Sequence, residues 1–462
     1  MIRRVVSAST IGTALEWYDF MLYGTAAALV FSKVFFPTGD LLAGTLASLG
    51  TFAVGFFARP VGGLLFGHLG DRYGRRFVLV VTLTVMALSS TAIGLIPDYR
   101  SIGVAAPVIL VLLRVAQGLG AGAEYAGGAL MAAEHAPPGR RGLFAAIPPT
   151  GNALGVILAT LVFTPFTWLP QDAFLSWGWR VPFLVSILIL PIGLYIRSRV
   201  DETPAFTETV KAGDRSNAPV VEVVREAPGS LLKGFLLSVG PNVATYIPSV
   251  YALSYMTDNV GLAAAVATGG LLVANTIKLV TLPLSGALSD RLGRKPVFIS
   301  GATLCAVAAF PFFWLLDSGN VILVWLAMVV VLTFANDLML GSQASMLPEQ
   351  FPTRVRFTGV AASRELAAAA AGGTLPFIAA FLTARTQGTW AISTLMVVMC
   401  AIAVAGALGV RDGRSVSFTD RGDGTNDGAG DGTSDDTSDG RGGLRGDGTA
   451  ALRDTAPTDR AR

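Results

Sequence analysis

The chain carries one ten-residue pattern twice, as Gly67-His-Leu-Gly-Asp71-Arg72-Tyr-Gly74-Arg75-Arg76 and as Gly286-Ala-Leu-Ser-Asp290-Arg291-Leu-Gly293-Arg294-Lys295. The two copies lie 219 positions apart, and each follows the second long apolar segment of a group of six. A weaker repeat places arginines at 140–141 and at 354–356, after the fourth segment of each group. An internal repeat of this length indicates two structurally similar halves.

The composition identifies lipid as the solvent around these segments. Of 462 residues, 52% are hydrophobic and 14% are charged, against roughly 25% charged in ordinary soluble domains. Residues 411–462 hold 19 of the 65 charges, so the other 410 residues carry only 26 basic and 20 acidic side chains. That is too few for the charged shell of a soluble enzyme. Without a basic face, the chain is also not expected to bind nucleic acid.

Twelve segments are long enough to cross a bilayer as helices, for which about 20 apolar residues are needed. Six are uncharged: Leu41–Ala58, Phe77–Ile96, Gly142–Gln171, Val181–Ile196, Val297–Leu316 and Thr386–Val410. Six carry one to three charges: about 8–31, 104–133, 230–256, 262–285, 320–346 and 356–382. Asn, Pro and Gly interrupt the segments near 142–168 and 230–256, where we expect local kinks. The sequence therefore predicts an all-α membrane protein.

The distribution of Lys and Arg predicts the orientation of these helices. Alternate loops, beginning with the one at Met1, hold 18 basic residues, and the opposite loops hold four, namely Lys33, Arg100, Arg180 and Arg385. Because basic loops stay on the cytoplasmic side, both termini are predicted to be cytoplasmic. The acidic residues Glu16 and Asp19 interrupt the apolar stretch that follows Met1–Arg4, so we interpret this stretch as an uncleaved first helix rather than a signal peptide.

Four regions follow from the repeat. Residues 1–200 form an N-terminal six-helix bundle, 201–228 a cytoplasmic linker, and 229–410 a C-terminal six-helix bundle. The Gly/Asp/Thr-rich tail, 411–462, has almost no large apolar residues and is predicted to be disordered. Two parallel six-helix halves around a midplane site are typical of a rocking secondary transporter.

Several motifs of the body resemble one transporter superfamily. The repeated loop is similar to the signature loop of the major facilitator superfamily, and Arg114-Val-Ala-Gln117-Gly118-Leu-Gly120-Ala-Gly122 is similar to its R-x-x-Q-G-x-G-x-G segment. Other motifs resemble its metabolite:proton symporter family, which includes proline/betaine, shikimate, 2-oxoglutarate and citrate importers. These are Thr13-Ala-Leu-Glu16-Trp17-Tyr18-Asp19-Phe20 with Tyr23-Gly24, Ala58-Arg59-Pro60, Trp179-Arg180-Val-Pro182-Phe183, Asp201-Glu202-Thr203-Pro204 and Pro348-Glu-Gln-Phe-Pro352-Thr-Arg354.

This resemblance implies the major facilitator fold and a conformational latch on the cytoplasmic side. Asp71 would face the positive N-terminal end of the eleventh helix, and Arg75 would pair with Glu134. The second copy would repeat the pattern with Asp290 and Arg294. The latch residues are Gly67, Asp71, Arg72, Gly74, Arg75, Arg76, Glu134, Asp290 and Arg294.

Charged residues inside the predicted spans are the candidates for coupling to a proton. Glu16 and Asp19 are three positions apart on the first helix, and carboxylates in a span normally face a cavity or a partner. One of them would take up and release the proton; the alternative is a structural ion pair with an arginine of a neighbouring helix. In the superfamily's comparable segment, an arginine at the position of Arg114 is tied to proton coupling.

The substrate-binding candidates are one arginine near the end of a span and several neutral groups. Arg59 would offer a carboxylate a bidentate fork; the alternatives are an ion pair with Glu16 or Asp19 and an interfacial position. Tyr23, Asn152, Asn242, Tyr246 and Arg180 complete the candidates, although single neutral groups often only join helices and Arg180 resembles an interfacial anchor. Lys278, Asp337, Arg364 and Glu365 also lie within spans of the second half.

Other classes of site are not expected. Cys305, Cys400, His68 and His135 do not have the spacing of metal ligands. The segment 118–123 formally matches the dinucleotide fingerprint G-x-G-x-x-A, but no βαβ unit surrounds it. We interpret its glycines as sites of close helix approach.

The sequence thus predicts a symporter of the inner (cytoplasmic) membrane that imports a small polar metabolite with a proton. A carboxylate-bearing osmolyte such as proline or glycine betaine is favoured slightly over shikimate or an oxoacid. No cofactor beyond the coupling proton is expected, and the partners are the substrate, the proton and the bilayer, with the protein a monomer. The alternatives are a proton-driven exporter and a non-transporting membrane receptor or enzyme.

Overall fold

The computed structural model is built from helices. It describes residues 2–37, 40–73, 75–122, 136–137, 139–198, 223–225, 227–351 and 356–410, with the backbone only for 2–9, 41, 64, 67–73, 75–79, 189, 192–198 and 357. Residues 1–418 form one compact unit. The predicted tail and nearly all of the predicted linker lie outside the described residues.

The helices of the first half coincide with the predicted spans. They are α1 (Ile2–Ala26), η1 (Ala27–Phe31), α2 (Ser32–Val34), α3 (Leu41–Tyr73), α4 (Arg75–Leu95), α5 (Tyr99–Ile102), α6 (Ala105–Ala121), α8 (Arg141–Ala146), α9 (Thr150–Phe163), η2 (Thr164–Trp168), α10 (Gln171–Ala173), η3 (Phe174–Gly178) and α11 (Arg180–Ser198).

The second half follows the same plan. Its helices are α14 (Pro228–Tyr246), η4 (Ile247–Tyr251), α15 (Ala252–Asp258), α16 (Ala264–Leu292), α17 (Arg294–Asp317), α18 (Val321–Met328), η5 (Val329–Ala335), α19 (Asn336–Met346), η6 (Pro348–Gln350), α20 (Arg356–Ala368), η7 (Ala369–Gly373), α21 (Thr374–Thr386) and α22 (Trp390–Gly409).

The predicted kinks are present, and they reflect the repeat. A break around Pro148 and Pro149 separates α8 from α9, and the π-helical turn η4 interrupts the helix formed by α14 and α15. The first helix has a π-helical turn of its own, η1, which begins 220 positions before η4. This spacing nearly equals the 219 positions between the two copies of the signature loop. The two halves therefore bend corresponding helices at corresponding points.

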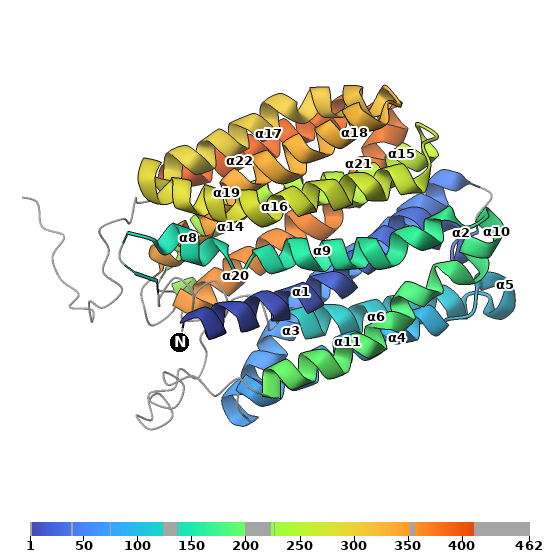
Figure 1. Cartoon of the computed structure of the whole chain (residues 1–462), viewed down its shortest axis with the longest axis horizontal. Helices are drawn as coiled ribbons and strands as arrows, with labels where there is room; N and C mark the ends of the chain where they lie inside the picture. The colour runs from blue at the N-terminus through green and yellow to red at the C-terminus, as the bar shows by residue number, and fades with distance from the viewer. Residues whose placement is uncertain are drawn as a thin grey trace, which may run out of the picture. The chain divides into compact units, whose positions relative to one another are not determined.

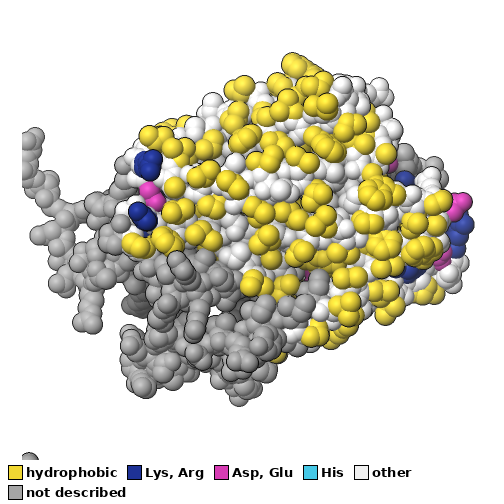
Figure 2. All heavy atoms as spheres, viewed as in Figure 1, with side chains coloured by type: hydrophobic (Ala, Val, Ile, Leu, Met, Phe, Trp, Pro, Cys, Tyr) yellow, Lys and Arg dark blue, Asp and Glu magenta, His cyan; other side chains and the backbone are white. Residues whose placement is uncertain are grey.

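The surface of the helices is that of a membrane protein. Among the described residues, seven helices are long and apolar enough to span a bilayer. Large apolar side chains are exposed on them, as far as 76% for Ile322 and 68% for Val307. On the face shown in Figure 2, hydrophobic side chains cover the middle and charged side chains gather at the two ends. The number of twelve crossings and the cytoplasmic position of the termini stay predictions.

Contacts between elements define how the helices pack. In the first half, α1 packs on α9, α4 on α11 and α3 on α6; in the second, α14 and α17 both pack on α22 (Figure 1). Between the halves, α16 packs on α8 and α9, and α3 packs on η7 and α21. The buried charged residues of the predicted spans lie on α1, α3 and α6 in the first half and on α16, α19 and α20 in the second.

Glycines bring α3 and α6 into close contact, as predicted. A Cβ atom at Gly118 would overlap the carbonyl oxygen of Gly55, and one at Gly122 would overlap that of Arg59. Small residues at such positions let the two backbones approach directly. This close approach sets the position of Arg114 on α6 relative to Arg59 on α3.

Candidate functional site

Arg114 is a buried cation that three aromatic rings surround. Its side chain is 1% exposed. Its Cζ lies 4.1 Å from the ring centroid of Tyr23, 4.7 Å from that of Phe20 and 5.1 Å from that of Phe52. The negative faces of aromatic rings attract a guanidinium, and a desolvated contact of this kind stabilises by about 2 kcal/mol. The rings therefore keep the cation in the apolar interior without neutralising it.

The hydrogen-bonding capacity of this guanidinium is largely unused. Nη1 donates to Oε1 of Gln117 at 3.2 Å. Nε and Nη2 are buried and make no hydrogen bond to the described part of the chain. A guanidinium has five N–H donors in a fixed fork that matches a carboxylate. Arg114 thus presents a charged fork to which a small anion would be complementary.

Asp19 is connected to Arg114 through two neutral side chains. It accepts hydrogen bonds from the hydroxyls of Ser186, at 2.7 Å, and of Ser90. Gln117 donates through Nε2 to Ser90 Oγ at 2.6 Å and accepts from Arg114 through Oε1. The hydrogen bonds therefore run without interruption from Asp19 through Ser90 and Gln117 to Arg114. Within the described ranges, no cation forms an ion pair with Asp19.

Glu16 has a different environment from Asp19, although both lie on α1. Its Oε1 is 3.2 Å from Nη2 of Arg59. Arg59 also binds Glu365 of α20 with two contacts, Nε to Oε2 at 2.7 Å and Nη2 to Oε1 at 3.2 Å. The fork of Arg59, predicted as a substrate-binding candidate, is thus occupied by Glu365 here. The ion pair that was the alternative interpretation for both Glu16 and Arg59 is the one observed.

An aromatic cluster lies beside these charges and joins the two halves. Tyr246 of α14 stacks on Trp17 of α1, with ring centroids 6.4 Å apart and planes 16° apart. It meets Phe56 of α3 edge to face at 5.1 Å and also contacts the rings of Phe20 and Phe52. Two of the rings that surround Arg114 therefore belong to this cluster. A ligand on Arg114 would lie next to residues of both halves.

Asp290 and Arg294, the two residues of the second copy that were predicted to contribute to a latch, both make polar contacts. Asp290 accepts the backbone N–H groups of Gly142, at 2.8 Å, and of Leu143, at 3.0 Å, at the start of α8 in the first half. Arg294 forms an ion pair with Glu349. These are the counterparts of the contacts predicted for Asp71 and Arg75. The first copy, from Gly67 through Asp71, Arg72, Gly74 and Arg75 to Arg76, and Glu134 lie outside the residues whose side chains the structure describes.

Three other candidates do not join the Arg114 site through any hydrogen bond in the described part of the chain. Arg180 donates to the backbone oxygens of Gly94 and Ile96 and lies over the ring of Trp179. It therefore caps the C-terminal end of α4. Asn152 is nearly buried on α9. Asn242 has a buried Nδ2 without a hydrogen bond.

Sequence reasoning missed the polar residues that connect the charges. Ser186 is a single serine in an apolar segment, and Ser90 lies in the short run Ser89-Ser90-Thr91; neither pattern indicates a partner. Gln117 did carry a signal, because it lies three positions after Arg114 and so on the same face of the helix. Glu365 was noted only as a charge within a span, without its partner.

Comparisons with known proteins identify the family and the fold of the chain. Residues 9–373 match the sequence profile of the Major Facilitator Superfamily. The "Shikimate transporter" of Escherichia coli is 35% identical over 414 residues, covering 89% of this chain and 94% of that protein. The "Proline/betaine transporter" of Salmonella typhimurium is 36% identical over 424 residues, covering 89% and 84%. The crystal structure of a D-xylose-proton symporter superposes with a TM-score of 0.68 at 20% identity, covering 89% and 98%.

Proposed function

Because the chain belongs to the Major Facilitator Superfamily and is a multi-pass membrane transporter, we propose that it imports a small carboxylate-bearing metabolite together with a proton. The observation that carries this proposal is the unused fork of Arg114 among aromatic rings. A buried cation is costly in a membrane unless a ligand or partner balances it. A substrate carboxylate would supply that balance.

The proton would be carried by Asp19 rather than by Glu16. Glu16 lies in an ion pair with Arg59. Asp19 has only hydroxyl partners among the described residues, and through Ser90 and Gln117 it is connected to Arg114. A proton on Asp19 removes a negative charge near Arg114. Substrate binding would therefore be favoured when Asp19 is protonated, as symport requires.

The substrate class follows from the relatives and from the site together. One relative is named for shikimate and another for proline and betaine. These compounds share a carboxylate group, and their remaining parts differ in charge. Arg114 would bind the shared group, whereas the aromatic cluster around Tyr246 would contact the rest. A proton-driven importer requires a membrane with a proton gradient, so we infer the inner (cytoplasmic) membrane.

The test is uptake by the purified full-length chain in proteoliposomes. Radiolabelled L-proline, glycine betaine and shikimate are offered with and without an inwardly directed proton gradient. We expect accumulation of at least one of them, and its loss when an ionophore collapses the gradient. Gradient-independent uptake would overturn the proton coupling. No uptake of any of them, with gradient-driven extrusion of drugs instead, would favour the exporter.

A further inference from the structure

The second half contains a buried ion pair that the mechanism above does not use. Lys278 of α16 and Asp337 of α19 are 2% and 1% exposed, and Nζ of Lys278 lies 3.1 Å from Oδ1 of Asp337. The elements packed on α19 are α8, α14, α16, α17, η5 and η6, and within the described ranges Lys278 of α16 is the charged group that forms an ion pair with Asp337. The pair is therefore neutral as a unit.

Neighbouring groups hold both members of this pair in place. Thr281, one turn after Lys278, donates to Oδ2 of Asp337, and Ser285 donates to the backbone oxygen of Asp337 at 2.6 Å. Lys278 donates to the carbonyl oxygen of Leu332 at 3.3 Å. Leu332 lies in the π-helical turn η5, and such turns occur frequently at functional sites. These hydrogen bonds fix the positions of both charged side chains.

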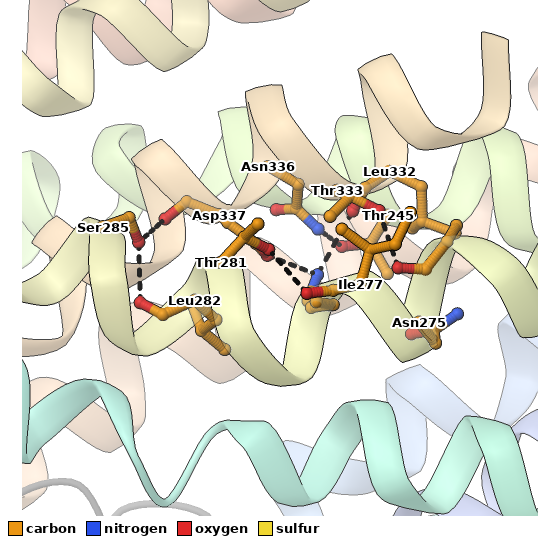
Figure 3. A network of polar contacts seen from close by, with 12 residues as sticks. Thr245, Asn275, Ile277, Thr281, Leu282, Ser285, Leu332, Thr333, Asn336 and Asp337 are labelled. Atoms are coloured by element: carbon orange, nitrogen blue, oxygen red, sulfur yellow. Dashed lines mark hydrogen bonds and ion pairs between the residues drawn. The ribbon is translucent and has the colours of Figure 1, made fainter. Parts of the chain in front are cut away.

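The ammonium group of Lys278 and the side-chain oxygen of Asn336 can each form a further hydrogen bond. An ammonium group has three donors, and Lys278 directs them to two partners among the described residues, Asp337 and Leu332. Asn336, labelled next to Asp337 in Figure 3, has a buried Oδ1 that accepts no hydrogen bond from the described part of the chain. An unsatisfied buried polar atom costs about 1–3 kcal/mol, and a polar ligand would satisfy it.

This position is connected to the aromatic cluster beside Arg114. Asn336 donates through Nδ2 to Oγ1 of Thr245 at 2.8 Å. Thr245 directly precedes Tyr246, whose ring contacts Trp17 and Phe56 of the first half. The helix α16 also packs on α9 of the first half. The ion pair therefore lies in the second half, next to elements that contact the first half.

We propose that Lys278 is a second cation for the substrate carboxylate, contributed by the second half in addition to Arg114 of the first, and that Asp337, as a second protonatable carboxylate besides Asp19, occupies this position until a proton binds to it. This proposal rests on the proposed function and names a residue that binds the substrate. Proton binding to Asp337 forms its O–H bond and releases Lys278, and the substrate carboxylate then pairs with the ammonium. For an anionic substrate such as shikimate, the proton and the substrate change the net charge of the pair in opposite directions, so the buried site stays neutral only when both bind, which couples the two. For zwitterionic proline or glycine betaine, the same pairing holds for the carboxylate group that contacts Lys278.

The test is equilibrium binding to the purified full-length chain, with radiolabelled L-proline, glycine betaine and shikimate as probes, at acidic and at alkaline pH. Removing the charge-assisted contact in Lys278→Gln should weaken binding about 10-fold to 100-fold. Asp337→Asn leaves Lys278 without its internal partner. It should bind at least as tightly as the wild type, with a weaker dependence on pH.

The double variant Lys278→Gln/Asp337→Asn decides between binding and a purely structural role. It leaves no unpaired buried charge, so it is the variant expected to fold even where Lys278→Gln does not. We expect it to have a wild-type unfolding temperature and still to bind about 10-fold or more weakly. Wild-type affinity in the folded double variant would overturn the proposal, because the pair would then only join helices.

A matched control is Thr333→Val. Thr333 donates to the carbonyl oxygen of Ala274 at 2.8 Å, so it links η5 to α16 without contacting the ion pair. It should bind the probes as the wild type does, and a loss equal to that of Lys278→Gln would overturn the specific role of the charge. If the wild type binds none of the three probes, the proposed function itself fails, and this proposal fails with it.

Discussion

Arg59 in α3 and Glu365 in α20 form a two-contact ion pair, Nε to Oε2 at 2.7 Å and Nη2 to Oε1 at 3.2 Å, across 306 positions of the chain. The two residues belong to different halves of the repeat. Glu16 shares the same guanidinium from α1 through a single contact of 3.2 Å. Any motion that separates α3 from α20 must therefore break a buried, charge-assisted contact.

A double-mutant cycle measures this contact. We expect Arg59→Gln and Glu365→Gln to be non-additive in thermal unfolding of the purified protein, with a coupling energy of about 1–3 kcal/mol. The cycle of Arg59 with Glu16 should give a smaller value, because that pair has one contact instead of two. Additive effects in the first cycle would contradict a bridge between the halves.

Asp19→Asn should separate substrate binding from proton coupling. The asparagine has nearly the same shape and can still bond to Ser186 and Ser90, but it cannot exchange a proton. Accumulation driven by a proton gradient should be lost, whereas exchange of labelled for unlabelled substrate at equal pH should persist. The matched control is Ser186→Ala, which removes only one hydrogen bond to Asp19 and should keep gradient-driven accumulation. Normal accumulation by Asp19→Asn would show that another group carries the proton.

Gln117→Leu should break the connection between Asp19 and Arg114. Leucine keeps the volume but cannot bond to Ser90 or to Arg114, so the substrate affinity should vary less with pH than in the wild type. Gln343 is a suitable control, since it is also buried and donates to a serine, Ser238, at 2.9 Å, but in the second half. Gln343→Leu should leave the pH dependence unchanged. Equal effects of both variants would assign them to loss of packing.

The fold could be predicted from the sequence because a helix that crosses a bilayer must be apolar over its whole length. Apolar runs of about 20 residues located the spans. The signature pattern at Gly67 and Gly286 revealed the repeat, and the glycines after Arg114 marked a close helix contact that Gly118 and Gly122 confirm. Each of these signals is local in the sequence. The π-helical turns were not predicted, since no residue type in η1 or η5 distinguishes them from an α-helix.

The site was predictable only in part, because its contacts depend on how separate helices are rotated against each other. Spacing on one helix placed Glu16 and Asp19 near each other but gave no indication that they have different partners. The rotation of α1 directs Glu16 to Arg59 and Asp19 to Ser186. Likewise, nothing near Glu365 indicated that it would bind Arg59 rather than a substrate-facing group.

Gly118→Ala should destabilise the contact between α3 and α6. The added methyl group would overlap the carbonyl oxygen of Gly55, and overpacking of this kind costs about 1–3 kcal/mol. The thermal unfolding midpoint should fall. Gly229→Ala is the control, because its Cβ would meet open space and alanine is the better helix former. A midpoint for Gly118→Ala equal to that of the wild type would show that the two helices can move apart without cost.

Asp290→Asn should open the contact between α16 and α8. Asp290 accepts two backbone N–H groups, from Gly142 and Leu143, and an asparagine side chain has only one acceptor atom. Losing a charge-assisted hydrogen bond of about 1.5–3 kcal/mol should increase the open population about 10-fold or more. Maleimide labelling of an introduced Ala146→Cys reports this opening against a low background, since Cys305 and Cys400 are buried. The control is Asp317→Asn. Asp317 ends α17 and accepts a hydrogen bond from Tyr255, away from the contact between α16 and α8. Equal labelling rates in the two variants would mean that Asp290 does not hold the halves together.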